Sequence, residues 1–280
     1  MKTKLQKVAK RVLLLLLCAW LGLVLLAALF YPRLLYHPDR SAPAVTPKLL
    51  GADGYEELWL TAADGVRLHA WFVPAQAGRG NGKTLLVFHG NAGNLGTAAP
   101  RLVLYSRYGF DAFMVDYHGF GRSEGEISES NLYLDAEAAW RYLTIARGVA
   151  PGNIVILGYS LGGAVASWLA ERRPEAAGLV LESTFTSLAD IAAGLFPFLP
   201  CRLIVGDAFN TLVRLANIKM PLLVVHGEGD ELVSFRFGEM LFTAHTGKKA
   251  FQLIGDDHNL GFLQASDRYG QALWAFAGTL

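Results

Sequence analysis

The sequence predicts an α/β protein with a mostly parallel central sheet, helices on both faces, a preceding antiparallel hairpin, and one transmembrane helix at the start. Two observations predict the α/β fold. Short apolar runs rich in β-branched residues alternate with helical periodicity from residue 84 onwards, and two earlier segments alternate apolar and polar residues as hairpin strands do. A third observation, a charge-free apolar opening segment, predicts the membrane helix. The rest suits one domain of about 230 residues.

Residues 1–11 form a basic tail, which we expect on the cytoplasmic side of a membrane. The next 19 residues, 12–30, carry no charge. As a helix they span about 28 Å and match the hydrocarbon core of a bilayer. The basic flank predicts a single-pass anchor (residues 12–31) with the domain on the opposite side, facing the periplasm if the host is a bacterium.

Two other kinds of segment compete with an uncleaved anchor. A cleavable signal peptide ends in small residues, whereas Leu29, Phe30 and Tyr31 follow the alanines at 27 and 28. A lipoprotein signal has a small residue before its cysteine, whereas Leu17 precedes Cys18. The sequence therefore favours an anchor that stays attached.

Composition argues against nucleic-acid binding. The net charge is +1, and without the five basic residues of the tail the other 20 basic and 24 acidic residues leave −4, so no basic patch is expected. We expect no metal and no cofactor, because no Cys/His cluster has metal-site spacing. Cys18 and Cys201 lie in the anchor and the domain, so we expect no disulfide and no indication of redox compartment.

The domain (residues 55–280) follows a short, stiff, proline-containing tether within residues 32–54. Strands at 55–61 and 66–73 are joined through Asp64-Gly65, which is typical of a hairpin. The elements expected after them are strands at 84–88, 111–116, 154–157, 178–181, 221–226 and 250–254, and helices at 95–108, 130–146, 161–173, 235–244 and 262–276. Because ligands of such sheets bind beyond the carboxyl ends of the strands, the candidate site residues should gather at that edge.

Ser160 lies where a buried strand becomes a helix, with Gly158 and Gly162 two residues away on either side. A turn this sharp strains the serine backbone and leaves no room for side chains at those two positions. It also presents the hydroxyl at the positive end of a helix. We predict a nucleophile, with the Leu161 amide pointing at the oxyanion of an attacked carbonyl. A structural serine in a tight turn is the alternative, because G-x-S-x-G is a short pattern.

Two later residues can activate this serine, which needs a base and a carboxylate that orients the base. Asp230 lies in the loop after the 221–226 strand, and His258 lies just past the 250–254 strand. Both lie on the same edge as Ser160. We predict Ser160 as nucleophile, His258 as general base and then acid, and Asp230 as the orienting carboxylate.

Three other carboxylates compete with Asp230, which as a turn residue after glycine could have no catalytic role. Glu182 ends the intervening strand, while Asp256 and Asp257 are too close in sequence to His258 to orient it easily.

Of the seven histidines, His258 alone follows the last strand. His226 ends a strand and is expected to be a hydrogen-bonded core residue, and His118 and His245 are expected in surface turns.

The second oxyanion donor is expected from the loop after the 84–88 strand, H-G-N-A-G-N. Its small residues let the backbone turn inward, so we predict the Asn91 amide as donor, with Ala92 as the alternative. His89 is expected to hold this loop by a hydrogen bond. The loop lacks the G-K-[ST] ending of a phosphate loop.

Six motifs together give the chain a family resemblance. They are F-H-G-N-A-G-N (88–94), D-Y-H-G-F-G-R-S-E-G (116–125), G-Y-S-L-G-G-A-V-A (158–166), L-E-S-T-F-T-S (181–187), V-V-H-G-E-G-D-E-L-V (224–233) and D-H-N (257–259). The set resembles the α/β-hydrolases, in which the acid and then the histidine follow the serine. Within them it resembles the membrane-tethered serine hydrolases of the α/β-hydrolase domain-containing type, which include eukaryotic protein depalmitoylases.

The resemblance implies hydrolysis of an ester, a thioester or, less often, an amide through an acyl-enzyme on Ser160. Two positions depart from the family pattern: His118 stands where arginine is usual, and Asp257 stands where glycine is usual. His118 should leave catalysis untouched. Asp257 could crowd the loop that carries His258 or alter the pKa of that histidine. A non-catalytic scaffold of the same fold and a serine peptidase of related fold are the alternatives, although the complete order of the three residues argues against a scaffold.

Residues 185–218 form an apolar insertion broken by prolines at 197 and 200. We expect one or two short helices that cap the pocket and form an apolar acyl-binding wall. Ordinary core packing would account for the same composition. An anchored enzyme with such a cap suits a small-molecule, lipid or acylated substrate that partitions into a bilayer.

Overall fold

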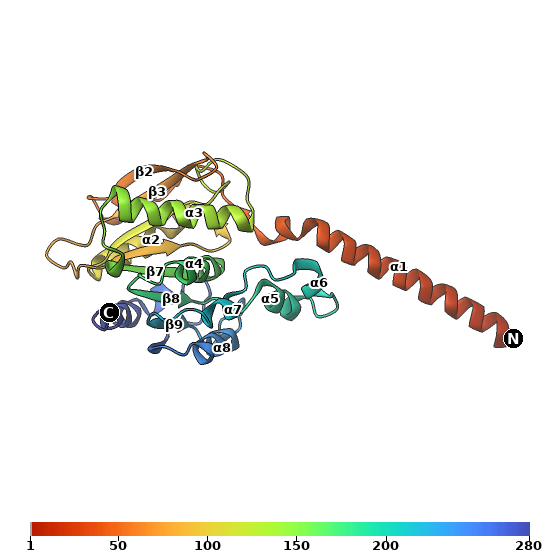
Figure 1. Cartoon of the computed structure of the whole chain (residues 1–280). Helices are drawn as coiled ribbons and strands as arrows, with labels where there is room; N and C mark the ends of the chain where they lie inside the picture. The colour runs from red at the N-terminus through yellow and green to blue at the C-terminus, as the bar shows by residue number, and fades with distance from the viewer. Residues whose placement is uncertain (1) are drawn as a thin grey trace.

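A computed structural model describes residues 2–280, so Met1 of the predicted basic tail lies outside the described residues. The body is built on an eight-stranded sheet, which confirms the predicted α/β architecture (Figure 1). Its strands, in spatial order, are β10 (Lys249–Leu253), β9 (Leu222–His226), β8 (Gly178–Glu182), β7 (Ile154–Tyr159), β4 (Thr84–Phe88), β6 (Asp111–Val115), β3 (Arg67–Val73) and β2 (Glu56–Thr61). The first six are mutually parallel, and the hairpin of β2 and β3 joins antiparallel to β6.

Both faces of the sheet are covered because strand residues alternate between two cores. In β4, Leu86 and Phe88 face one core, while Leu85 and Val87 face the other. The first core is closed by α3 (Glu129–Arg141), α4 (Leu161–Arg172), α7 (Thr211–Leu215) and α8 (Phe235–Ala244). The second is closed by α2 (Leu95–Arg107), α9 (Gly261–Gln264) and α10 (Ser266–Ala277).

The sheet order determines where the site lies. The strands β7, β8, β9 and β10 are consecutive neighbours and parallel, so the loops that follow them emerge at one edge. Ser160, Asp230 and His258 follow β7, β9 and β10. The fold therefore brings together residues that are far apart in the chain.

The apolar N-terminal helix α1 (Lys2–Leu35) extends away from the body (Figure 1). It is long and apolar enough to cross a membrane, and the apolar stretch is not buried against the body. The expected tether after it is hydrogen-bonded to the body: β1 (His37–Pro38) pairs in parallel with β5 (Ala92–Gly93). A short 3₁₀ helix, η1 (Lys48–Leu50), follows.

Several elements differ from expectation. The insertion forms three short helices, α5 (Leu188–Leu195), α6 (Cys201–Val205) and α7, where one or two were predicted. The last predicted helix is interrupted at Ala265, whose backbone (φ −121°, ψ 31°) is not helical and separates α9 from α10. The 130–146 helix ends in a π-helical turn, η2 (Tyr142–Ala146), and a 3₁₀ turn, η3 (Pro151–Asn153), precedes β7.

The expectation of surface turns for two histidines was wrong, because both His118 and His245 are buried. His118 lies between two carboxylates, with Nδ1 2.5 Å from Asp135 and Nε2 3.0 Å from Asp64. Burial alone would lower the pKa of His118, but the hydrogen bonds and charges of these carboxylates outweigh burial and raise it.

Candidate active site

Ser160 occupies a strained turn between β7 and α4. Its backbone has φ 52° and ψ −125°, a region that residues with a side chain rarely adopt and that costs about 1–3 kcal/mol. The turn is held by hydrogen bonds on both sides: the Ser160 amide donates to the Glu182 carbonyl at 2.9 Å, and Thr184 Oγ1 donates to the Ser160 carbonyl at 2.6 Å. The hydroxyl is thereby fixed at the start of a helix while staying partly exposed.

The two glycines that flank the serine are required by close backbone approach. A Cβ on Gly158 would lie 2.0 Å from the Gly162 carbonyl oxygen, and a Cβ on Gly162 would lie 2.0 Å from the Phe88 carbonyl oxygen. The obstructing atoms therefore belong to the start of α4 and to the end of β4. Neither position accepts a side chain without moving the turn.

The structure brings the three predicted residues into one chain of hydrogen bonds. His258 Nε2 lies 3.1 Å from Ser160 Oγ, and His258 Nδ1 lies 2.8 Å from Asp230 Oδ2. With a proton on Nδ1, the imidazole donates to the carboxylate and presents a bare Nε2 to the hydroxyl. This arrangement can take a proton from Ser160.

Asp230 is fixed in the loop after β9 by its own backbone. Its Oδ1 accepts from the amides of Leu232 at 3.0 Å and Val233 at 2.8 Å. Burial alone would raise the pKa of the Asp230 carboxyl, but the hydrogen bonds from His258 and Val233 outweigh burial and lower it. His226 donates from Nε2 to the Val233 carbonyl at 2.9 Å, so it supports this loop as a buried core residue.

The rival Glu182 is fully engaged elsewhere. Its carboxylate pairs with Arg101 and accepts from the Tyr269 hydroxyl at 2.5 Å. The Arg101 guanidinium lies between two rings, 4.1 Å from the centroid of Tyr159 and 3.7 Å from that of Phe262. Because Tyr159 precedes the serine and Phe262 follows the His258 loop, the buried Arg101 guanidinium connects the two segments that carry Ser160 and His258.

The other two rivals bind backbone amides. Asp256 Oδ1 accepts from the Gly229 amide at 2.9 Å. Asp257 Oδ1 accepts from the amides of Asn259 and Leu260, both at 2.8 Å. Asp257 is exposed and turned toward these amides, so it orders the loop that carries His258.

The predicted oxyanion loop passes directly over the serine. A Cβ on Gly90 would lie 3.4 Å from Ser160 Cβ. The Gly90 backbone therefore packs against the nucleophile, and the Asn91 amide belongs to the next peptide along this backbone. The Asn91 side-chain amide donates to the Leu35 carbonyl at 2.6 Å, and the Asn91 backbone carbonyl accepts from the His37 amide at 2.8 Å. The segment that leaves α1 is therefore bound to this loop.

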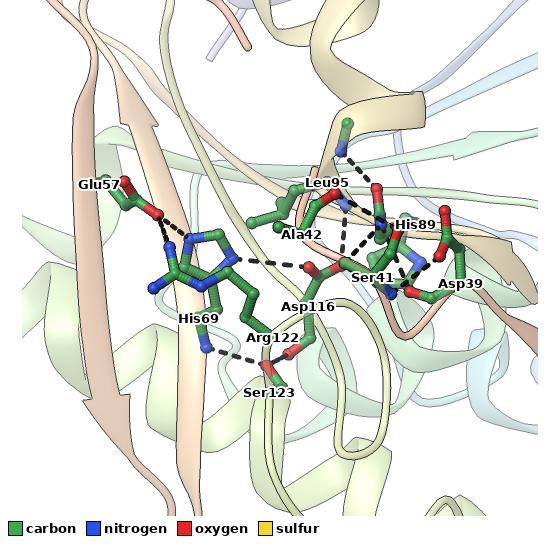
Figure 2. A network of polar contacts seen from close by, with 12 residues as sticks. Asp39, Ser41, Ala42, Glu57, His69, His89, Leu95, Asp116, Arg122 and Ser123 are labelled. Atoms are coloured by element: carbon green, nitrogen blue, oxygen red, sulfur yellow. Dashed lines mark hydrogen bonds and ion pairs between the residues drawn. The ribbon is translucent and has the colours of Figure 1, made fainter. Parts of the chain in front are cut away.

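A buried polar network holds the two ends of the same loop (Figure 2). The Tyr117 hydroxyl donates to the His89 carbonyl at 2.9 Å, and Asp116 Oδ1 accepts from the Leu95 amide at 2.9 Å. His89 Nδ1 lies 2.9 Å from the Gly90 carbonyl, which can only accept, so this nitrogen carries the proton. Burial lowers the pKa of His89 and keeps the ring neutral.

On its other side the network reaches the hairpin. Asp116 also faces His69, whose Nδ1 is 3.7 Å from Oδ2 (Figure 2). His69 Nε2 lies 2.7 Å from Glu57, which also binds Arg122. The network links β2 and β3 to the loop beside Ser160.

Sequence reasoning missed Arg101, Asp116 and the pairing of β1 with the oxyanion loop. Asp116 carried a signal, because it follows a buried strand at the same sheet edge as the other site residues. Arg101 lies within a helix and carried none. Within residues 2–280, no three His, Cys, Asp or Glu side chains are grouped to hold a metal ion.

Comparisons with known proteins agree with this geometry. A family model described as the alpha/beta hydrolase fold matches residues 83–202. The chain is 36% identical over 228 residues to an uncharacterized protein of Mycobacterium tuberculosis, covering 81% of this chain and 80% of that protein. It is 35% identical over 241 residues to the alpha/beta hydrolase domain-containing protein WAV2 of Arabidopsis thaliana, covering 79% of this chain and 77% of that protein.

Among solved structures, an esterase of Pyrococcus furiosus is similar with a TM-score of 0.71 and 21% identity, covering 88% of this chain and 98% of that chain. At this identity the likeness shows the fold. The sheet order, the strained serine turn and the two curated relatives lead to one conclusion: the chain belongs to the α/β-hydrolase family and is a hydrolase of this fold.

Proposed function

We propose that this chain is a membrane-anchored serine hydrolase that cleaves a carboxylic ester or thioester through an acyl-enzyme on Ser160. The observation that carries the proposal is the hydrogen-bonded series from Ser160 Oγ through His258 to Asp230. The anchor is supported by α1, whose apolar stretch is not buried against the body.

In the first half-reaction, His258 Nε2 takes the hydroxyl proton as Ser160 Oγ attacks the acyl carbon. The tetrahedral oxyanion accepts hydrogen bonds from the Leu161 and Asn91 amides. The intermediate collapses as the bond from the acyl carbon to the leaving group breaks, and His258 gives its proton to the departing alcohol or thiol. Asp230 stabilises the imidazolium throughout.

In the second half-reaction, water replaces the leaving group. His258 takes a proton from the water, which attacks the acyl carbon of the ester on Ser160. Collapse of the second tetrahedral intermediate breaks the bond to Ser160 Oγ, and the proton returns to the serine. The carboxylic acid leaves, and the enzyme is restored.

Labelling with a fluorophosphonate probe tests the proposal. The wild-type chain should be labelled and should hydrolyse p-nitrophenyl esters, whereas Ser160→Ala should lose the label and His258→Ala should react far more slowly. Both changes should lower kcat by about 10³-fold or more while the unfolding midpoint stays near that of the wild type. A folded wild-type chain that takes no label would favour the non-catalytic scaffold.

The acyl group can be examined with p-nitrophenyl esters from acetate to palmitate. An apolar wall formed by residues 185–218 predicts a preference for longer chains. A preference for acetate would remove the argument for that wall and leave the serine chemistry untouched.

A further inference from the structure

The segment of α5, α6 and the loop between them exposes apolar side chains to the outside. Leu203 is 87% exposed and Phe198 is 59% exposed, and Leu195 and Phe196 are exposed beside them. We call these four residues the cap face. Because these side chains are exposed, they do not form the buried acyl-binding wall that the sequence suggested. An exposed apolar surface of this kind marks a contact with another apolar surface.

The charges within this segment cancel each other. Residues 188–206 contain one acid and one base, Asp190 and Arg202, whose side chains pair at 3.1 Å. Burial alone would raise the pKa of Asp190, but its hydrogen bonds and the Arg202 charge outweigh burial and lower it, so the acid is ionised and matches the guanidinium. Arg202 is long enough to carry its head toward a polar boundary while its stem lies on apolar surface.

The backbone of the segment is also largely satisfied from within. The prolines at 197 and 200 carry no N–H. Five neighbouring amides donate to carbonyls of the same segment: those of Phe196, Leu199, Cys201, Leu203 and Ile204. Such internal pairing is what irregular backbone requires where water is absent.

The cap face lies beside the apolar part of α1. Trp20 Nε1 donates to the Phe198 carbonyl at 3.0 Å, and α1 contacts α6. Figure 1 shows α5 and α6 on the side of the body from which α1 extends. Along the helix, Trp20 is about 14 Å from Arg11 and about 20 Å from Arg33, so it lies near the middle of the charge-free stretch.

We propose that the cap face enters the hydrocarbon layer of a lipid bilayer beside α1 and forms a second membrane contact of this chain. This rests on the proposed anchoring by α1, because the Trp20 contact places Phe198 at a depth where the helix is surrounded by lipid. The contact also satisfies an indole N–H and a loop carbonyl that would otherwise lack partners there.

The position of the cap gives this contact a role in substrate delivery. The chain enters the cap from Thr184, whose side chain is bonded to the nucleophile's own carbonyl. An acylated lipid or lipid-modified substrate that stays in the bilayer would then meet the cap face before it reaches Ser160. The substrate class is therefore an acyl ester or thioester held in the membrane.

Nitroxide accessibility in the full chain tests the proposal without requiring activity. The chain is reconstituted in phosphatidylcholine vesicles with Cys18→Ser and Cys201→Ser, and the label is placed at Leu203→Cys. A matched label at Ile145→Cys reports an apolar site that is 74% exposed on the body. A third sample keeps Cys18, which is exposed on α1, and reports the anchor itself.

The label at position 203 should collide with oxygen several-fold more than with a water-soluble nickel chelate, as the label at position 18 does, and the label at position 145 should show the reverse. Equal behaviour of positions 203 and 145 would overturn the proposal while position 18 still reports the anchor. Protection of position 203 from both reagents would overturn it in favour of a protein contact such as a second copy. A water-exposed label at position 18 would refute the anchor and, with it, the proposal, whereas the serine chemistry would stand on the probe assay.

Discussion

Replacing Asp230 by asparagine tests how the carboxylate orients the base. The two oxygens of Asp230 have different tasks: Oδ1 accepts from the Leu232 and Val233 amides, and Oδ2 accepts from His258 Nδ1 at 2.8 Å. Asparagine has only one oxygen. Two backbone donors hold that oxygen in the Oδ1 place, so the NH₂ group must face His258.

This orientation forces the wrong tautomer of the imidazole. Nδ1 of His258 would have to accept from the NH₂ group, so the ring proton would move to Nε2, which lies 3.1 Å from Ser160 Oγ. A protonated Nε2 cannot take the serine proton. We expect kcat to fall about 10⁴-fold, equivalent to about 5.5 kcal/mol, with little change in KM.

The assay is steady-state hydrolysis of a p-nitrophenyl ester by the purified full chain in detergent, with the unfolding midpoint measured in parallel. Asp256→Asn is the matched control, because its single oxygen can keep the bond to the Gly229 amide, and it should stay close to wild type. If Asp230→Asn kept roughly a tenth or more of the wild-type kcat, the tautomer argument would be refuted.

Three further predictions concern the supports of the site. Asn91→Ala removes the 2.6 Å hydrogen bond to the Leu35 carbonyl, worth about 1 kcal/mol, and should lower kcat about fivefold without changing the fold; an unchanged kcat would show that the loop is held by its other contacts. Arg101→Met leaves Glu182 buried without its partner and should destabilise the chain by about 3–5 kcal/mol in urea unfolding, with partial recovery when Glu182→Gln is added; an unaltered midpoint would contradict this. The raised pKa of His118 contributes stability that is complete below about pH 6.5 and is lost as pH rises through the folded-state pKa. The unfolding free energy of the wild type should therefore decline as pH rises above about 6.5, and His118→Gln should flatten that decline; parallel curves for the two chains would exclude His118 as the cause.

The local sequence pattern was sufficient to predict the strands, the turn at Ser160 and the apolar N-terminal helix. The apolar run of β4 and the glycines around Ser160 can be recognised from neighbouring residues, although the structure shows that Gly162 is also required by the distant Phe88 carbonyl. The placement of Asp230 and His258 at the same sheet edge as Ser160 followed from the rule that parallel strands end at one edge, so these candidates needed no coordinates.

Only the tertiary structure decided between residues of the same chemistry. Asp230 and Glu182 both end or follow a strand at the correct edge, and the choice depends on Arg101 and Tyr269, which come from two helices far away in sequence. Two other contacts are likewise long-range. The strand β1, which follows α1, pairs with β5 in the oxyanion loop, and Trp20 contacts Phe198. Sequence periodicity reports which face of an element is buried, but it does not report which partner covers that face, because the partner is set by how distant elements pack.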